Sequence, residues 1–145
     1  MNISDFKNPF FIGVAGVGMS AIAQYLQGIG KNVSGSDRYF HPDEYNKTKE
    51  QLENEGIKCF LQDGSGITTE TDLVVVSTAI EDTVYEVKKA KELGIPIIKR
   101  SQLLAMIAKS KKTVAVAGTS GKSTTSAMLF QILLDAGLEP SIISG

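Results

Sequence analysis

Two glycine-rich turns, each between a short apolar run and a helical pattern, constrain the fold of this chain most. The first turn contains Gly13, Gly16 and Gly18, and the second contains Gly118 and Gly121. A strand that passes through small residues into a helix is the repeating unit of parallel α/β sheets. The sequence is therefore expected to fold as an α/β protein.

Apolar runs and helical patterns alternate along the first three quarters of the chain. Strands are expected at 10–15, 32–36, 57–61, 72–77 and 95–98, and helices at about 19–29, 43–55, 84–93 and 101–108. This order predicts a Rossmann-like parallel sheet with helices on both faces. Helical spacing predicts two buried stripes, formed by Met19, Ile22, Ala23, Leu26 and Ile29 and by Val84, Val87, Ala90 and Leu93.

A second strand–turn–helix unit follows a polar break at 109–112. Strands are expected at 113–117 and 141–144, with a helix at about 123–136 between them. One helix and two strands are too few to bury the faces of a sheet. We therefore expect one domain over residues 1–110 and the truncated start of a second over 111–145. The alternative is that the second unit docks on the first domain as an appendage.

Composition narrows the classes of partner. The 145 residues include 15 basic and 16 acidic side chains, so no overall field attracts nucleic acid or an anionic membrane. One cysteine, Cys59, and one histidine, His41, argue against a disulfide framework and a structural zinc site. Cys59 is expected to be a buried, inert thiol. No signal peptide or apolar span of about 20 residues is present, which favours a soluble cytoplasmic protein.

The first turn approximates the dinucleotide-binding pattern G-x-G-x-x-G, with Ala15 in place of the middle glycine. Unpaired N–H groups and the positive end of the helix dipole bind phosphate at such a turn. Asp37, at the end of the second strand, has the spacing of an acid that contacts a ribose hydroxyl. These features predict nucleotide binding. The alternative is that the glycines only allow close packing of the strand and the helix.

The second turn, in the stretch VAVAGTSGKS, departs from a strict P-loop because Val116 occupies the first glycine position. Gly118, Gly121, Lys122 and Ser123 keep what the chemistry needs: backbone N–H groups around phosphates, an ammonium for the β and γ oxygens, and a hydroxyl for Mg²⁺. The sequence predicts a second phosphate site. The alternative is a surface turn with a solvated lysine.

The chain resembles the Mur ligases of peptidoglycan synthesis. The resemblance is carried by the stretches GVAGVGMSAIAQYL, VSGSD, DLVVVSTAI, IPIIKRSQLL and VAVAGTSGKSTTSAML. It implies that the first domain binds a UDP-sugar and that the second is a P-loop domain that binds ATP and Mg²⁺. The implied reaction is the ATP-dependent joining of L-alanine to UDP-N-acetylmuramate, and the chain alone is expected to bind the sugar nucleotide without ligating it.

The resemblance also implies roles for individual residues. The residues implied for the UDP-sugar follow three of the strands and are Gly16, Val17, Gly18, Met19, Ser20, Asp37, Ser77, Thr78, Ala79 and Ile80. The residues implied for ATP are Gly118, Thr119, Ser120, Gly121, Lys122, Ser123 and Thr124. Lys122 is the implied catalytic residue on the β and γ phosphates, and Ser123 is the implied Mg²⁺ ligand.

Three questions stay open at this level. The acceptor can be an amino acid or, as in a related ligase, a peptide. A non-enzymatic NAD- or nucleotide-sensing Rossmann domain is the alternative from another class, although such a domain needs no second phosphate turn. Arg100 follows the fifth strand, where its guanidinium can pair with a phosphate or carboxylate or can be a plain surface group.

Overall fold

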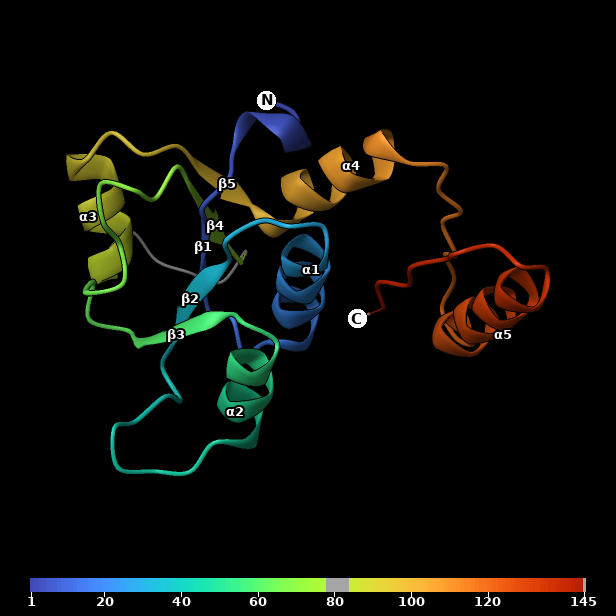
Figure 1. Ribbon diagram of the computed structural model, residues 1–145, viewed down its shortest axis with the longest axis horizontal. Helices are drawn as coiled ribbons and strands as arrows, with labels where there is room; N and C mark the ends of the chain where they lie inside the picture. The colour runs from blue at the N-terminus through green and yellow to red at the C-terminus, as the bar shows by residue number, and fades with distance from the viewer. Residues whose placement is uncertain (78–83, 145) are drawn as a thin grey trace.

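The computed structural model describes residues 1–77 and 84–144. Its described strands form one five-stranded parallel sheet in the order β3-β2-β1-β4-β5 (Figure 1). The strands are β1 (Pro9–Ile12), β2 (Ser34–Asp37), β3 (Lys58–Leu61), β4 (Leu73–Val76) and β5 (Ile97–Lys99). The helical elements are η1 (Ile3–Asp5), α1 (Val17–Gly28), α2 (Lys47–Asn54), α3 (Tyr85–Glu92), α4 (Arg100–Ser110) and α5 (Lys122–Asp135). The expected Rossmann-like parallel sheet is confirmed.

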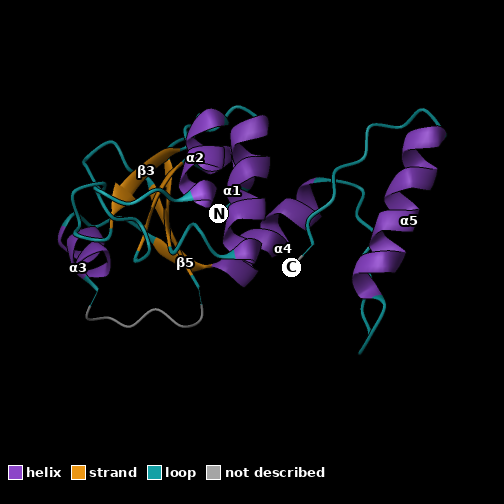
Figure 2. Ribbon diagram, turned by 90° about the horizontal axis from the view of Figure 1, so that it is seen from below, coloured by secondary structure: helices purple, strands orange, loops and turns teal. Residues whose placement is uncertain are grey.

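The central strand β1 contributes to an apolar core on each face of the sheet. Phe11 packs in the cluster that α1, α2 and α4 cover, whereas Phe10 and Ile12 pack in the cluster under α3. Figure 2 shows these helices on opposite faces. Strands buried on both faces carry apolar residues at successive positions, which explains the run in β1 and in β4. Each fully buried Phe, Ile, Leu or Val side chain contributes about 1.5–3 kcal/mol to the free energy of folding.

Strand β2 has the polar sequence SGSD and is nevertheless buried over three of its four residues. A Cβ on Gly35 would lie 2.7 Å from the carbonyl oxygen of Phe11 and 2.8 Å from Cβ of Val14. No side chain fits that space, so β2 approaches β1 closely because Gly35 has none. This approach brings the ends of the two strands, and the first glycine turn, together.

The helix ends differ in detail from expectation. Ile29 and Leu93 are 45% and 42% exposed, because α1 and α3 end one residue before them and the chain turns away. The other stripe residues predicted for α1 are buried, and Val87 and Ala90 are buried on α3. Helix α2 begins later than expected because the side chain of Asn46 caps it, accepting from Lys49 N at 3.0 Å.

The strands expected at 113–117 and 141–144 are wrong for this structure. Neither segment pairs with another strand within the described chain, and α5 between them has no buried residue. An isolated extended segment cannot satisfy its backbone groups by pairing, so it has no strand ladder without a neighbour. Helix α5 lies apart from the sheet (Figure 1). Of the described residues after α4, Ile143 is the one that packs against the main core.

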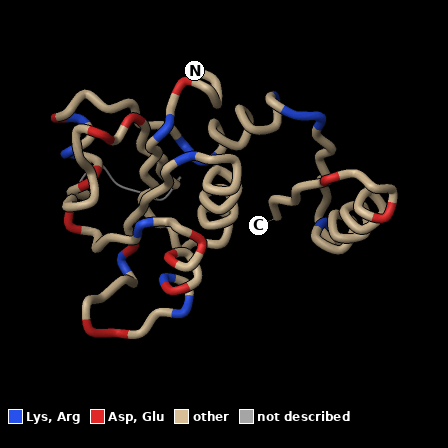
Figure 3. The backbone as a smooth tube through the Cα atoms, in the orientation of Figure 1, with Lys and Arg blue, Asp and Glu red and all other residues tan. Residues whose placement is uncertain are grey.

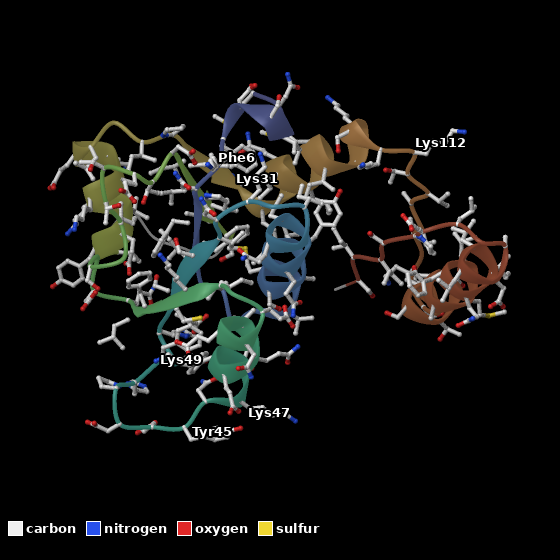
Figure 4. The ribbon with its side chains drawn as sticks, viewed as in Figure 1. Phe6, Lys31, Tyr45, Lys47, Lys49 and Lys112 are labelled. Carbon is white, nitrogen blue, oxygen red and sulfur yellow. The ribbon has the colours of Figure 1, made fainter. Side chains whose placement is uncertain are left out.

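Lys31 fastens η1 to the body of the domain. Its Nζ donates to the carbonyl oxygens of Ile3 at 2.6 Å and Phe6 at 2.5 Å, and it lies 4.8 Å from the centre of the Phe6 ring (Figure 4). One ammonium thus satisfies two carbonyls and covers an aromatic face.

We expect Lys31→Met to lower the free energy of unfolding by about 1–3 kcal/mol, because two carbonyls lose their donor while the apolar stem is kept. Lys112→Met, at an exposed position, is the matched control and should change it by less than about 0.5 kcal/mol. Urea unfolding followed by circular dichroism measures both. Equal effects of the two substitutions would contradict this role.

Candidate functional site

The sequence-predicted residues for the first ligand meet at the carboxyl edge of the sheet. The first glycine turn follows β1, Asp37 ends β2, and Ser77 follows β4, and these three strands are neighbours. Ligands of open α/β sheets bind at this edge, where the chain turns to opposite sides of the central strands. Of the predicted set, Thr78, Ala79 and Ile80 lie outside the described residues.

Backbone hydrogen bonds anchor the first turn on β2. The N–H groups of Gly13 and Val14 both donate to the carbonyl oxygen of Ser36, at 2.8 and 3.0 Å. The next N–H, that of Ala15, donates to Oδ2 of Asp37 at 2.9 Å. The turn is thereby held at three consecutive residues before α1 begins.

Asp37 has a structural task that the sequence did not indicate. Its side chain is only 4% exposed, and its Oδ1 accepts from Tyr39 N at 3.1 Å while Oδ2 holds Ala15. Charge-assisted bonds to backbone N–H groups are about twice as strong as neutral ones. A contact from Asp37 to a ribose stays a prediction, whereas its hold on the turn is visible in the structure.

The first turn of α1 presents backbone donors that no acceptor in the described part of the chain pairs. Gly16 is the N-cap, and its carbonyl oxygen accepts from Met19 N at 2.9 Å and Ser20 N at 2.8 Å. No side chain caps α1 and no acid lies in its first turn, so the N–H groups of Val17 and Gly18 have no partner within the helix. Together with the helix dipole, these two N–H groups suit an anion. The Met19 side chain is buried in the core cluster and so fixes the start of α1 to the face of the sheet.

Arg100 joins this turn from the other side of β4. It is the first residue of α4, directly after β5, and its side chain lies against Gly18. A Cβ on Gly18 would be 3.1 Å from Cζ of Arg100 and closer still to Nη1. The sequence left Arg100 undecided, since no spacing rule connects a residue after the fifth strand to the first glycine turn.

The second glycine turn opens α5. Gly121 is the N-cap, and Nζ of Lys122 folds back to donate to the carbonyl oxygen of Gly118 at 2.8 Å. Ser123 Oγ lies 3.5 Å from Oγ of Ser144. All the residues predicted for ATP are exposed and lie in this single turn: Gly118, Thr119, Ser120, Gly121, Lys122, Ser123 and Thr124.

Titratable groups elsewhere take no visible part in these turns. Cys59 is half-buried, so the expectation of a buried thiol is met only in part. This partial burial, aided by the charge of Glu53, raises the pKa of the thiol to about 12, which keeps it protonated at neutral pH. A hydrogen bond from Ser65 lowers the pKa of exposed Asp63. Within residues 1–77 and 84–144, no three acidic, histidine or cysteine side chains gather to hold a metal ion, and no helix is long and apolar enough to cross a membrane.

A cavity of about 400 Å³ lies at the opposite, amino-terminal edge of the sheet, lined in part by Asn8, Asn32 and Lys58. Its amides are bonded within the protein: Asn32 donates to Asn8 Oδ1 at 2.8 Å, and Asn8 donates to the carbonyl oxygen of Glu70 at 2.9 Å. These groups hold loops together and do not await a ligand. The unpaired donors of α1 therefore mark the better candidate site.

Comparison with known proteins identifies the family. Residues 10–112 match the family described as "Mur ligase family, catalytic domain". The chain belongs to the Mur ligase family. The matched stretch runs from β1 to just beyond α4, and it includes the first glycine turn, Asp37 and Arg100. The resemblance inferred from the sequence is thereby confirmed.

Individual relatives support this assignment to the family. The UDP-N-acetylmuramate–L-alanine ligase of Dichelobacter nodosus is 39% identical over 139 residues, which are 96% of this chain and 28% of the relative. The structure of UDP-N-acetylmuramate–alanine ligase from Thermotoga maritima is 29% identical with a TM-score of 0.78, covering 91% of this chain and 30% of that one. A UDP-N-acetylmuramate:L-alanyl-γ-D-glutamyl-meso-diaminopimelate ligase from Neisseria meningitides is 30% identical with a TM-score of 0.81, covering 97% and 43%. The chain thus spans less than a third of the length of the curated relative.

We expect Asp37→Asn to lower the free energy of unfolding by about 1–3 kcal/mol, because the amide nitrogen would face an N–H that the carboxylate now accepts. Faster hydrogen exchange of the Ala15 amide should accompany the loss. Asp43→Asn, at an exposed loop position, is the control. If urea unfolding and hydrogen exchange do not distinguish the two variants, Asp37 does not hold the turn.

Proposed function

We propose that this chain supplies the UDP-N-acetylmuramate-binding part of an ATP-dependent ligase that joins L-alanine to that sugar nucleotide in peptidoglycan synthesis, in the cytoplasm. The observation that carries the proposal is the uncapped start of α1 beside Arg100, in a chain of the Mur ligase family. Relatives named UDP-N-acetylmuramate–L-alanine ligase support the choice of sugar nucleotide and amino acid.

The diphosphate binds over the first turn of α1 in this proposal. The N–H groups of Val17 and Gly18 donate to it, while Gly16, Met19 and Ser20 shape the turn through their mutual hydrogen bonds. Asp37 approaches the uridine end while it holds Ala15. Ser77, which follows β4, is proposed to line another wall of the pocket. Thr78, Ala79 and Ile80, implied for the same wall by the resemblance, lie outside the described residues.

We propose that residues 1–110 form the sugar-nucleotide domain and that 111–145 begin a P-loop domain for ATP. Helix α5 has no buried residue, and Val114, Met128, Ile132 and Leu138 are exposed. Apolar side chains in this number call for further elements to cover them. The greater length of the relatives supports a parent protein that supplies such elements.

The second turn has the groups that ATP needs. Its backbone N–H groups wrap the phosphates, and Lys122 leaves the carbonyl of Gly118 to contact the β and γ oxygens, where its charge stabilises phosphoryl transfer. The exposed Ser123 hydroxyl fits Mg²⁺, because this ion commonly takes one or two protein ligands with phosphate oxygens and water. When bound, the ion neutralises negative charge on the β and γ phosphates.

The proposed reaction has two steps. The carboxylate of the sugar nucleotide attacks the γ-phosphorus of ATP, forming an acyl phosphate and releasing ADP. The amine of L-alanine then attacks the acyl carbon, phosphate leaves, and an amide bond forms. In this chain the first turn holds the sugar nucleotide and Lys122 stabilises the transferring phosphoryl group, while the amino acid binds elsewhere in the parent.

A peptide is the second candidate for the acceptor. The Neisseria ligase, whose printed name contains L-alanyl-γ-D-glutamyl-meso-diaminopimelate, has a TM-score of 0.81 with this chain. Both candidates share the sugar nucleotide, so the proposal for the first turn is the same for either. Membership of a ligase family disfavours the non-enzymatic sensor.

Calorimetry on the 145-residue chain tests the proposal. We expect binding of UDP-N-acetylmuramate and no binding of NAD, because the pocket is proposed for a uridine nucleotide that carries a sugar. Tight binding of NAD without binding of UDP-N-acetylmuramate would overturn the proposal in favour of the sensor. Binding of neither compound would leave the glycines with a packing role only.

A further inference from the structure

Arg100 and Gly18 lie far apart in the sequence and meet at the carboxyl edge of the sheet. Helices α1 and α4 cover the same face, where Met19, Leu103 and Ile107 share one core cluster (Figure 2). Strand β4 separates β1 from β5, so the starts of these two helices flank its carboxyl end. The shared core holds the two helix starts in a defined relation.

The contact explains why residue 18 is glycine. Any Cβ at this position would enter the space of the Arg100 guanidinium, whose Cζ would lie 3.1 Å away. No unusual backbone conformation requires glycine there, because Gly18 is helical and has no positive φ. The missing side chain therefore leaves room for the guanidinium over the first turn of α1.

The position of Arg100 is unfavourable for the stability of the protein alone. Neither α1 nor α4 has an acid in its first turn, and Lys99 is the N-cap of α4, so cations gather at two positive helix ends. The tube of α1 carries no charged residue (Figure 3). Helices α2 and α3, by contrast, carry Glu50 and Glu86 in their first turns.

The guanidinium also has no acceptor among the residues that the structure describes. Within residues 1–77 and 84–144, no carbonyl or carboxylate accepts from its N–H groups. A guanidinium has five donors in a planar fork that matches two oxygens of a phosphate or carboxylate. A cation without an acceptor, next to the unpaired N–H groups of Val17 and Gly18, indicates an anionic ligand.

We propose that Arg100 binds the diphosphate of the sugar nucleotide and clamps it against the first turn of α1. This inference rests on the proposed function and names a residue that completes its site. The N–H groups of Val17 and Gly18 contact the diphosphate from one side, and the guanidinium contacts it from the side of β5. Gly18 has two tasks here, since its N–H donates and its missing side chain admits Arg100.

The test measures dissociation constants of UDP-N-acetylmuramate, UDP and uridine for variants of the 145-residue chain. Arg100→Gln should weaken binding of UDP-N-acetylmuramate about ten- to a hundredfold, since a hydrogen-bonded charge is lost. The affinity of Arg100→Lys should lie between those of the unsubstituted chain and Arg100→Gln, because lysine keeps the positive charge but loses the planar pair of donors. Lys99→Gln, the neighbouring cation, is the matched control and should stay within about twofold.

Two readouts separate binding from a structural role. Arg100→Gln should reduce the advantage of UDP over uridine, whereas general damage to the pocket would weaken both alike. Gly18→Ala should displace the guanidinium without unfolding the protein, since a flexible side chain can move. The double variant, Gly18→Ala with Arg100→Gln, should then bind UDP-N-acetylmuramate about as weakly as the weaker of the two single variants. The reason is that both changes remove the same contact, that of Arg100 with the diphosphate.

The outcomes distinguish this inference from the proposed function. If the unsubstituted chain does not bind UDP-N-acetylmuramate, the proposed function fails. If it binds and Arg100→Gln binds within twofold while its thermal unfolding midpoint is unchanged, only the role of Arg100 is overturned. If Arg100→Gln does not fold, the test uses Gly18→Ala and Arg100→Lys instead. The role of Arg100 is then overturned if Gly18→Ala binds UDP-N-acetylmuramate as tightly as the unsubstituted chain, both alone and when combined with Arg100→Lys.

Discussion

The hydrogen bond from Ala15 N to the carboxylate of Asp37, at 2.9 Å, is the interaction on which the candidate site depends. It joins the turn after β1 to the end of β2, in a place where Gly35 allows the two strands to approach. The turn then enters α1 with its first N–H groups unpaired and directed toward the sheet edge. A carboxylate that is almost wholly buried can hold this shape because two backbone N–H groups compensate its charge.

Much of the sheet and of the helices that cover it could be predicted because the signals for these elements are local. The helical spacing of Met19, Ile22 and Leu26 gave the buried face of α1, and the β-branched run of β4 gave a strand buried on both sides. The errors lie at the ends of elements. Ile29 kept the apolar period of α1, but the helix had already ended, so the residue faces solvent.

The strands expected at 113–117 and 141–144 failed for a different reason. Residue type can favour an extended backbone, but a strand also requires a partner with which to form hydrogen bonds. No described strand lies beside either segment, so their apolar residues, Val114 and Ile142 among them, stay exposed. A strand is thus a property of a pair of segments, and a single sequence window shows only one of them.

The site itself could be predicted only in part. The glycine spacing located the two turns, and the distance from the first turn selected Asp37, which lies beside that turn. Its hold on Ala15 could not be predicted, and its contact with a ribose stays a prediction. Outside the site, the burial of Glu86 on α3, where it accepts from Gly64 N at 3.4 Å, could not be predicted from a charged helix either. Arg100 reached the site through the packing of α4 beside α1, which is a tertiary relation that no local pattern encodes.

The central claim is that the start of α1, braced by Asp37 and facing Arg100, is where the sugar nucleotide binds. Amide NMR spectra of the chain during titration with UDP-N-acetylmuramate test it most directly. The account predicts that the largest shifts occur at Val17, Gly18 and the Arg100 side chain, with little change at Gly121 and Lys122. Saturable shifts confined to the cavity around Asn8 and Asn32, with the α1 amides unmoved, would contradict it.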